Sequence, residues 1–233
     1  MHSFYRHDLL FLTPKARERI CGQIRSGCGS HGNQMAEAFG SGLIPAIVRR
    51  YAPCDHSDIG IGISFPIIVA GERLRFATAV TSAEIDGMIS PYAILGRPLD
   101  TTLPLLKALE KVKGLNLTRP GNLGVYGASA LQVVTGLNYV HDKSDLDLVI
   151  REESIGVLRH AKEVLSALER QIGVTIDVEV ILGSGNAVKL KELCSQQKTV
   201  LIKSILAVHV INKREAIGSL PVEYPANSGR VRE

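Results

Sequence analysis

Asp145 and Asp147 are the residues in this sequence whose type and spacing most directly suggest chemistry. They alternate with Leu146, Leu148 and Ile150 in a run typical of a β-strand. Side chains two residues apart on a strand point to the same face, so both carboxylates should share one site while the apolar residues face a core. Such a pair can hold two divalent ions about 3.5 to 4 Å apart during phosphoryl-type transfer. Oxygen ligands of this kind favour magnesium.

A second acidic strand strengthens this interpretation, because a single pair of aspartates can also be two solvated side chains. Asp177 and Glu179 stand two residues apart within Val174 to Leu182, and apolar residues lie between and beside them. Three or four carboxylates on one patch repel one another unless cations neutralise them. We therefore predict a magnesium site, with two ions, whose ligands come from both strands: Asp145, Asp147, Asp177 and Glu179.

Gly127 and Ser129 lie where a short apolar strand gives way to a helix. Gln132 follows Ser129 at the spacing of a capping box, so ordinary helix capping is one interpretation of this serine. Capping is compatible with a second role, because the free amides at a helix N-terminus, approached past a glycine, also form a phosphate-binding site. We therefore predict phosphate binding at Gly127 and Ser129.

Other phosphate-binding and nucleophilic motifs are missing from the sequence. No Gly-Lys dipeptide supports a P-loop, and Gly60-x-Gly62 lacks the third glycine of a dinucleotide fingerprint. No Gly-x-Ser-x-Gly marks a nucleophile elbow. These observations disfavour kinase, dehydrogenase and serine-nucleophile chemistry.

Composition limits the classes of partner. The chain has 233 residues, 45% of them apolar, which suffices for one large or two small folded domains. A net charge of +4, no Lys/Arg run and 5% aromatic residues argue against a nucleic-acid partner. The longest apolar run, Ile59 to Gly71, is too short and interrupted for a membrane span, and no signal-peptide core follows the start. We expect a cytoplasmic protein with no membrane partner and, given no CxxC spacing among four cysteines, free thiols.

We expect an α+β protein with two domains. Residues 1–90 should form a small β-rich N-terminal domain, and six glycines between Gly22 and Gly42 predict a flexible insertion within it. Residues 91–218 should form a nucleotidyltransferase-like catalytic domain, a mixed sheet with helices. Residues 219–233 have the composition of a polar tail.

The elements expected around the acidic residues alternate between helices and strands. In chain order they are a helix at Leu103 to Val112, a strand at Leu123 to Tyr126, a helix from about Ser129, a strand at Asp145 to Ile150, an amphipathic helix at Ile155 to Ile172 and a strand at Val174 to Leu182. The acids fall only on the last two strands, which should therefore lie near each other.

A longer element, Gln132-x-x-Thr135-Gly136-Leu137-x-Tyr139, lies between Gly127 and the paired aspartates. With its surroundings, Val125 to Tyr139 and Ser144 to Leu148, it resembles the malonate decarboxylase holo-acyl carrier protein synthase family, also called phosphoribosyl-dephospho-CoA transferases. Further segments extend the resemblance over most of the chain: His7 to Leu10, Val48 to Arg50, Glu72 to Ala77, Asp177 to Glu179, Gly185 with Ala187-Val188, Lys191 to Leu193 and Lys203-Ser204.

The sequence departs from the family pattern at three positions. Ala128 separates Gly127 from Ser129, where the family has adjacent glycine and serine. Leu131 and Leu190 stand where the family tends to carry tryptophan. The carboxylates are intact, so these departures bear on ligand placement more than on the class of reaction.

The resemblance implies transfer of the phosphoribosyl-dephospho-CoA prosthetic group from 2'-(5''-triphosphoribosyl)-3'-dephospho-CoA to a serine of the apo acyl carrier subunit of malonate decarboxylase, with release of diphosphate. On this hypothesis Asp145 and Asp147 bridge the metal ions, and Asp177, or else Glu179, completes the nucleophile side. Gly127 and Ser129 would cradle the diphosphate. Basic candidates for contacts with phosphate or carrier are Arg49, Arg50, Arg73 and Lys203.

Two alternatives remain open at this point. One is a nucleotidyltransferase of the same fold that uses a nucleoside triphosphate to modify another protein or a small molecule. The other is a catalytically inactive nucleotide-binding module, which the separation of Gly127 from Ser129 brings into consideration. Metal-dependent turnover and the identity of the donor distinguish these two alternatives from the phosphoribosyl-dephospho-CoA transferase.

Overall fold

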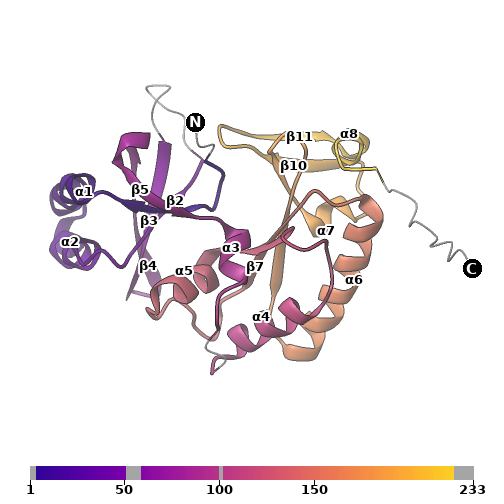
Figure 1. Cartoon of the computed structure of the whole chain (residues 1–233), viewed down its shortest axis with the longest axis horizontal. Coiled ribbons are helices and arrows are strands. Elements are labelled where there is room, and N and C mark those ends of the chain that lie inside the picture. The colour runs from indigo at the N-terminus through magenta and orange to yellow at the C-terminus, as the bar shows by residue number, and fades with distance from the viewer. Residues whose placement is uncertain (1–3, 51–58, 100–101, 223–233) are drawn as a thin grey trace, which may run out of the picture.

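The computed structural model describes residues 4–50, 59–99 and 102–222. Within them two β-sheets lie side by side, each with helices packed on it (Figure 1). This arrangement confirms the expected α+β class. In chain order the elements are β1 (Leu9–Leu12), α1 (Pro14–Gly27), η1 (Gly29–His31), α2 (Gly32–Gly40), β2 (Ala46–Val48), β3 (Ile59–Val69), β4 (Glu72–Val80), η2 (Ser82–Glu84), β5 (Ile85–Ile89), α3 (Pro91–Leu95), α4 (Pro104–Gly114), β6 (Leu123–Val125), α5 (Gly127–Thr135), β7 (Leu146–Arg151), α6 (Ile155–Ile172), β8 (Ile176–Ile181), β9 (Ala187–Lys189), α7 (Leu190–Leu193), β10 (Thr199–Lys203), β11 (Val208–Asn212) and α8 (Lys213–Gly218).

The first sheet has the strand order β4-β3-β2-β1-β5, and its neighbouring strands are antiparallel. Helices α1 and α2 lie together beside it, at the left of Figure 1. Their apolar side chains form one buried cluster with those of β1, β2 and β3. We call this sheet with its two helices the N-terminal unit; it contains more helix than the predicted β-rich domain.

The segment from Gly22 to Gly42 is mostly helical, so the prediction of a flexible glycine-rich insertion is wrong. Helix α1 continues to Gly27 and α2 begins at Gly32. A Cβ atom at Gly32 would lie 2.8 Å from the carbonyl oxygen of Ile24, inside the contact distance of any real side chain. Glycine at this position therefore serves the close approach of two helices rather than flexibility.

Ile59 to Val69 form one long strand, β3. Its pairing with β4 is irregular between Ser64 and Ile68. Pro66 lies within this irregularity, where it has no N–H to contribute to the ladder. The strand continues past the proline, because Ile68 and Val69 pair again with Arg73 and Glu72 of β4.

The second sheet has the order β11-β10-β9-β8-β7-β6 and is mixed, with β7 and β8 parallel. Helix α6 joins these two strands and spans the predicted range. The even-numbered residues of β7 and β8, such as Leu148 and Val178, pack with Leu158 and Leu165 of α6 in one core. The odd-numbered residues, which include the acids, therefore lie on the opposite face. We call this sheet with its helices the C-terminal unit.

The structure extends the sequence-based description of the C-terminal unit at three places. The strands predicted near Asp145 and Asp177 are β7 and β8, whereas β9, β10 and β11 were not anticipated. Helix α5 begins at Gly127 rather than near Ser129. Leu220, placed in the predicted polar tail, is buried in the core, and residues 223–233 of that tail lie outside the described residues.

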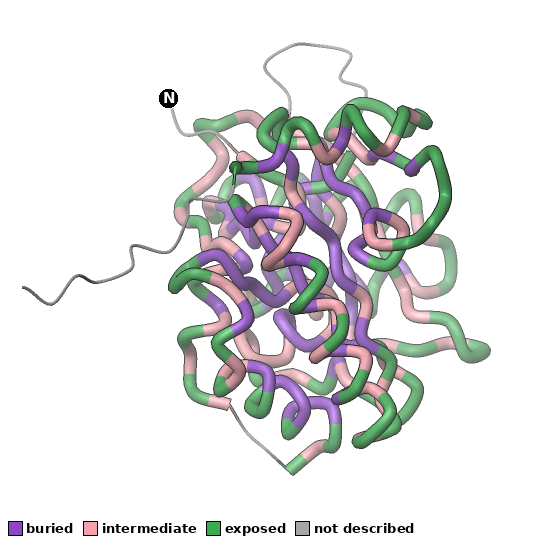
Figure 2. The backbone as a smooth tube through the Cα atoms, turned by 90° about the vertical axis from the view of Figure 1, so that its right-hand side faces the viewer, coloured by how far each residue is buried: buried purple, intermediate pink, exposed green. Residues whose placement is uncertain are grey.

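Burial is greatest along the inner strands of both sheets, as the purple tube in Figure 2 shows, whereas β4, β5 and β11 are mostly intermediate or exposed. Among the described residues, no helix is long and apolar enough to cross a membrane. Cys21, Cys28 and Cys194 are free thiols, and Cys54 lies outside the described residues.

Tyr139, the last residue of the motif that starts at Gln132, joins the two units. Its buried hydroxyl donates a hydrogen bond of 2.9 Å to the carbonyl oxygen of Ser64 on β3. Arg73 on β4 lies over the Tyr139 ring and donates to the Tyr139 carbonyl oxygen as well as to that of Phe65. A single aromatic side chain thus contacts two strands of the first sheet.

Tyr139→Phe should lower the free energy of unfolding by about 1 kcal/mol, because the ring stays buried while the Ser64 carbonyl loses a donor. Urea unfolding followed by circular dichroism would measure this, with Tyr5→Phe as the exposed control. An unchanged midpoint for Tyr139→Phe would show that the hydroxyl contributes nothing to joining the units.

Candidate active site

The parallel register of β7 and β8 places the acidic residues in two neighbouring rows. Asp147 pairs with Asp177, and Val149 pairs with Glu179. Asp145 is exposed and immediately precedes β7. The two strands predicted to carry the acids are therefore adjacent, and their acidic faces coincide.

Asp147 is the half-buried member of this group, and its environment opposes ionisation. Burial raises the pKa of its carboxyl to about 7, and the charges of Asp177, Asp145 and Glu179 add to the rise. Repulsion between like charges shows that these carboxylates lie within electrostatic reach of one another. A cation bound among these carboxylates would reduce their repulsion.

Gly127 lies directly against Asp147. Its φ of 68° belongs to the left-handed region, and a Cβ atom there would overlap the Asp147 carboxylate, lying 2.9 Å from its Cγ. The backbone of the residue before Gly127 is also tied to this strand, because the Tyr126 amide donates to the Asp147 carbonyl oxygen at 3.0 Å. Glycine is required here both by conformation and by space.

Ser129 does not cap helix α5, which corrects the capping-box interpretation. The residue at the N-cap position is Tyr126, and no side chain caps the helix. Ser129 is fully buried, and within the part of the chain that the structure describes its Oγ has no hydrogen-bond partner. Gln132 instead accepts hydrogen bonds from the amides of Tyr139 and Val140, so it shapes the loop that follows the helix.

Glu179 is bound on both carboxylate oxygens by three basic side chains. Lys203 Nζ lies 2.7 Å from Oε1, and His7 Nε2 lies 3.0 Å from Oε2. Arg6 Nη2 is 3.3 Å from Oε2. Although burial raises the pKa of Glu179, the hydrogen bond from His7 and the charges of Arg6 and Lys203 outweigh it and hold that pKa well below its usual range. Glu179 is thus a buried anion neutralised by the protein itself.

Next to these acids lie two aromatic side chains, His7 and Tyr126. The two rings stack with centroids 3.9 Å apart. Burial lowers the pKa of His7 despite the nearby Glu179 carboxylate. An ionised carboxylate only accepts hydrogen bonds, so His7 Nε2 is the donor in this contact. Burial raises the pKa of Tyr126, and the charges of Glu179, Asp147 and Asp177 raise it further.

Asp177 has a partner that sequence reasoning did not identify. Lys189 on β9 donates to Asp177 Oδ2 at 2.9 Å, with the two side chains partly exposed. Within residues 4–50, 59–99 and 102–222, no group of three or more His, Cys, Asp or Glu side chains is arranged to hold a metal ion. The acids on this face are held apart, with lysine supplying positive charge to one of them.

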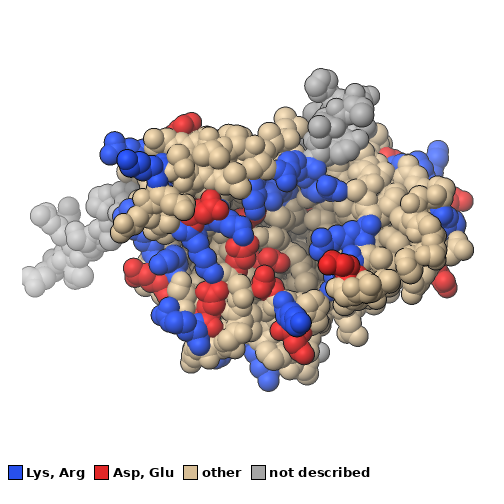
Figure 3. Space-filling model, turned by 180° about the vertical axis from the view of Figure 1, so that it is seen from behind, with Lys and Arg blue, Asp and Glu red and all other residues tan. Residues whose placement is uncertain are grey.

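Charges of both signs also meet on the surface of the molecule. Figure 3 shows Asp and Glu side chains near the middle of one face with Lys and Arg side chains around them. A nucleic-acid-binding face carries basic side chains in a patch of one sign. The charge pattern on this face is therefore more typical of a site for a small charged substrate.

Comparison with known proteins identifies this architecture. The model of the phosphoribosyl-dephospho-CoA transferase MdcG N-terminal domain matches residues 5–91, and that of the C-terminal domain matches residues 95–214. The chain belongs to the phosphoribosyl-dephospho-CoA transferase family. The resemblance seen in the sequence is confirmed, and the protein is a transferase enzyme.

Similar proteins named phosphoribosyl-dephospho-CoA transferase occur in several bacteria. One from Bradyrhizobium diazoefficiens is 26% identical over 91% of this chain and 92% of its own length. One from Xanthomonas euvesicatoria is 31% identical over 73% of this chain and 79% of its own. One from Pseudomonas putida is 29% identical over 82% of this chain and 90% of its own. Among solved structures, no significant match is found.

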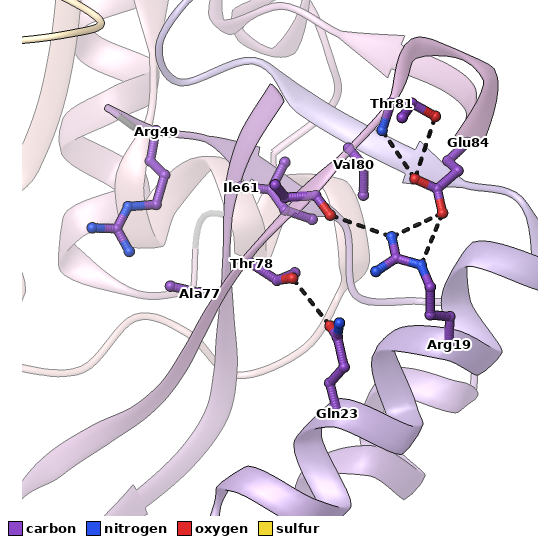
Figure 4. Close-up of a pocket in the computed structure, with 10 residues that line it drawn as sticks. Arg19, Gln23, Arg49, Ile61, Ala77, Thr78, Val80, Thr81 and Glu84 are labelled. Carbon is purple, nitrogen blue, oxygen red and sulfur yellow. Dashed lines mark hydrogen bonds and ion pairs between the residues drawn. The ribbon is translucent and has the colours of Figure 1, made fainter. Parts of the chain in front are cut away.

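Two of the basic residues proposed from the sequence lie away from the acids of this transferase. Arg73 is engaged by the carbonyl oxygens of Phe65 and Tyr139, as described above. Arg49 is exposed and lines a cavity of about 520 Å³ on the first sheet (Figure 4). Arg19 in that cavity is bound by Glu84, and Arg49 lies across Ile61 from this pair.

Only Lys203 among the basic candidates reaches the acidic face, and Arg50 is exposed at the end of the first described segment. The site also contains side chains that the chemical reasoning missed: Arg6, His7, Tyr126 and Lys189. His7 was visible only as part of a family segment, because no local spacing connects the start of the chain to β8. Lys189 follows an apolar pair on a strand too short to recognise.

Gly127→Ala should reduce transferase activity on the order of 100-fold, because an added Cβ displaces the Asp147 carboxylate. Gly136→Ala is the matched control, since Gly136 has a φ of 71° but nothing within 4 Å of its Cβ position. Both variants carry the backbone cost of about 1–2 kcal/mol. Comparable activity losses in the two would show that strain, and not contact with Asp147, matters.

Glu179→Gln should lower the free energy of unfolding on the order of 3 kcal/mol, because it leaves Arg6 and Lys203 without their counter-ion. The folded-state pKa of Glu179 is depressed, so its contribution is present above the ordinary value of 4.5 and is lost as the pH falls. The difference between wild type and variant should therefore narrow below pH 4.5. Urea unfolding at a series of pH values between about 3 and 8 would measure this difference in the free energy of unfolding. The exposed Glu163→Gln variant is the control. A difference that does not depend on pH would contradict the ion-pair role.

Proposed function

We propose that this transferase moves the phosphoribosyl-dephospho-CoA group from 2'-(5''-triphosphoribosyl)-3'-dephospho-CoA to a serine of the apo acyl carrier subunit of malonate decarboxylase, in the cytoplasm. The serine oxygen forms a bond to the α-phosphorus. The bond from that phosphorus to the bridging oxygen breaks, diphosphate leaves with the electron pair, and the hydroxyl proton passes to solvent. The product is a phosphodiester.

The observation that carries the proposal is the pairing of Asp147 with Asp177 beside Gly127. It brings two carboxylates to the N-terminus of α5, where the first amides of the helix have no intrahelical acceptors. Those amides, reached past Gly127, suit the diphosphate part of a triphosphate. Ser129 Oγ, which is buried and has no hydrogen-bond partner among the described residues, lies two residues further along the same turn.

The acidic side chains supply oxygen ligands of the kind that magnesium prefers, although among the described residues no three of them are arranged to hold a metal ion. Burial raises the pKa of Asp147, and the neighbouring like charges, which a divalent ion would compensate, add to the rise. Asp145, Asp147 and Asp177 are the ligands we propose, and Glu179 is less suited because three basic groups already engage its oxygens. Two bound ions would stabilise negative charge on the transferring phosphoryl group.

The remaining side chains of the site supply positive charge next to the acids and restrict the entry of water. Lys203 and Arg6 keep positive charge on the sheet face next to the acids. The stacked rings of His7 and Tyr126 lie beside Glu179, and we expect them to limit access of water to the site. A site with few waters would favour transfer to serine over hydrolysis of the donor.

The direct test mixes the protein, magnesium, the triphosphoribosyl donor and the apo carrier, and then measures the mass of the carrier. We expect a gain equal to the phosphoribosyl-dephospho-CoA group, with diphosphate in solution. ATP and the other nucleoside triphosphates in place of the donor should give no gain. No transfer from the triphosphoribosyl donor would overturn the proposal, and a gain from a nucleoside triphosphate would favour the alternative nucleotidyltransferase.

Asp145→Ala and Asp147→Ala should each reduce this transfer by about 100-fold or more, because charge stabilisation in the transition state is lost. Their melting temperatures should change little, since Asp145 is exposed and the like charges around Asp147 disfavour its ionised form. Asp142→Ala, an exposed acid in the preceding loop, is the control. A fully active Asp147→Ala variant would refute the metal role.

A further inference from the structure

A second cavity lies on the same face of the second sheet, at the other end of β7 and β8. It has a volume of about 790 Å³, and it lies between the two units. Val149, Arg151 and Ile181 form its floor on the sheet, while Arg6 and Asp8 from the chain start and Tyr92 from α3 form its sides. Nothing in the reaction proposed above uses this space.

The cavity and the acids share one row of side chains. Asp147, Val149 and Arg151 alternate on one face of β7, so Arg151 lies about 13 Å along the strand from Asp147. Arg6 lies between the acids and the cavity, because its Nη2 contacts Glu179 while the residue also lines the cavity. A ligand with two ends could therefore occupy both places at once.

The cavity contains cationic groups with unused donors. Within the described residues, Nη1 of Arg6 and Nε of Arg151 are buried and have no hydrogen-bond partner. The Arg151 guanidinium is held over the Tyr92 ring at 3.9 Å. Two arginines with free N–H groups favour the oxygens of a phosphate or diphosphate.

The rest of the lining is suited to an organic group of moderate size. Apolar side chains contribute much of it, including Met88, Leu182 and Leu220. A volume of this order matches sites for nucleotide-sized ligands, which combine apolar walls with a few polar groups. The nearby carboxyl of Asp8 is also buried, and burial raises its pKa to about 6.

We propose that this cavity binds the adenosine diphosphate portion of the dephospho-CoA donor, with the diphosphate at Arg6 and Arg151 and the adenine against the apolar walls. The inference rests on the proposed function, in which a ribosyl group separates the reacting phosphorus from the adenosine. This ribosyl group and the ribose of the adenosine together separate the reacting phosphorus from the diphosphate, which suits the distance from the acids to Arg151. The donor then lies along one face of β7, with Arg6 at its middle.

The test uses 3'-dephospho-CoA, which lacks the triphosphoribosyl group, and measures its binding by calorimetry without metal. Arg151→Gln should weaken binding at least tenfold, and Ser184→Glu, which adds charge at the exposed rim of the cavity, should do the same without disturbing the core. Arg170→Gln and Ser26→Glu change the same residue types at exposed positions on α6 and α1 and should bind as wild type does. ADP should displace dephospho-CoA, whereas pantetheine should not.

The outcomes separate this inference from the function on which it rests. No binding of dephospho-CoA to the wild type, or wild-type binding by both cavity variants, would overturn the cavity assignment even if carrier modification occurs. Displacement by pantetheine and not by ADP would overturn it too. Failure of transfer with intact, cavity-dependent binding of dephospho-CoA would instead count against the proposed reaction alone.

Discussion

The buried carboxylate of Glu179 is the interaction on which the arrangement of this protein depends. It belongs to the central strand β8, yet its partners come from the start of the chain and from β10. A buried carboxylate that lost these partners would carry a large desolvation cost, so the folded state keeps all of them in place. That requirement fixes the N-terminal unit over the acidic face of the second sheet, and with it the rings of His7 and Tyr126.

Neighbouring acids on the same sheet face have pKa values shifted in opposite directions. Two residues beyond Asp177, Glu179 is surrounded by basic side chains that hold its pKa well below the usual range, whereas burial and the neighbouring carboxylates raise the pKa of Asp147 to about 7. The protein itself therefore neutralises Glu179, whereas Asp147 is available to a bound cation. This difference in surroundings, rather than in residue type, separates a structural carboxylate from a candidate catalytic one.

Glycines in this chain illustrate why composition predicts backbone structure poorly. Six glycines between residues 22 and 42 suggested a loop, yet Gly32 allows two helices to approach and the segment is ordered. Gly127 makes a similar close approach, but to the Asp147 carboxylate. What each glycine permits depends on the atom that faces it, which is a property of the tertiary structure.

By itself, the sequence determined the α+β class, the strands that carry the acids, the helix between them and the transferase family, because these depend on periodicity and on motifs of nearby residues. Helix α6 followed from spacing alone, since its apolar stripe repeats with the period of a helix. Only the tertiary structure decided that Arg6 and His7 reach Glu179, that Arg73 holds Tyr139 and that Ser129 is buried without capping its helix. These contacts join residues far apart in the chain or depend on where a helix begins, and no local pattern encodes either.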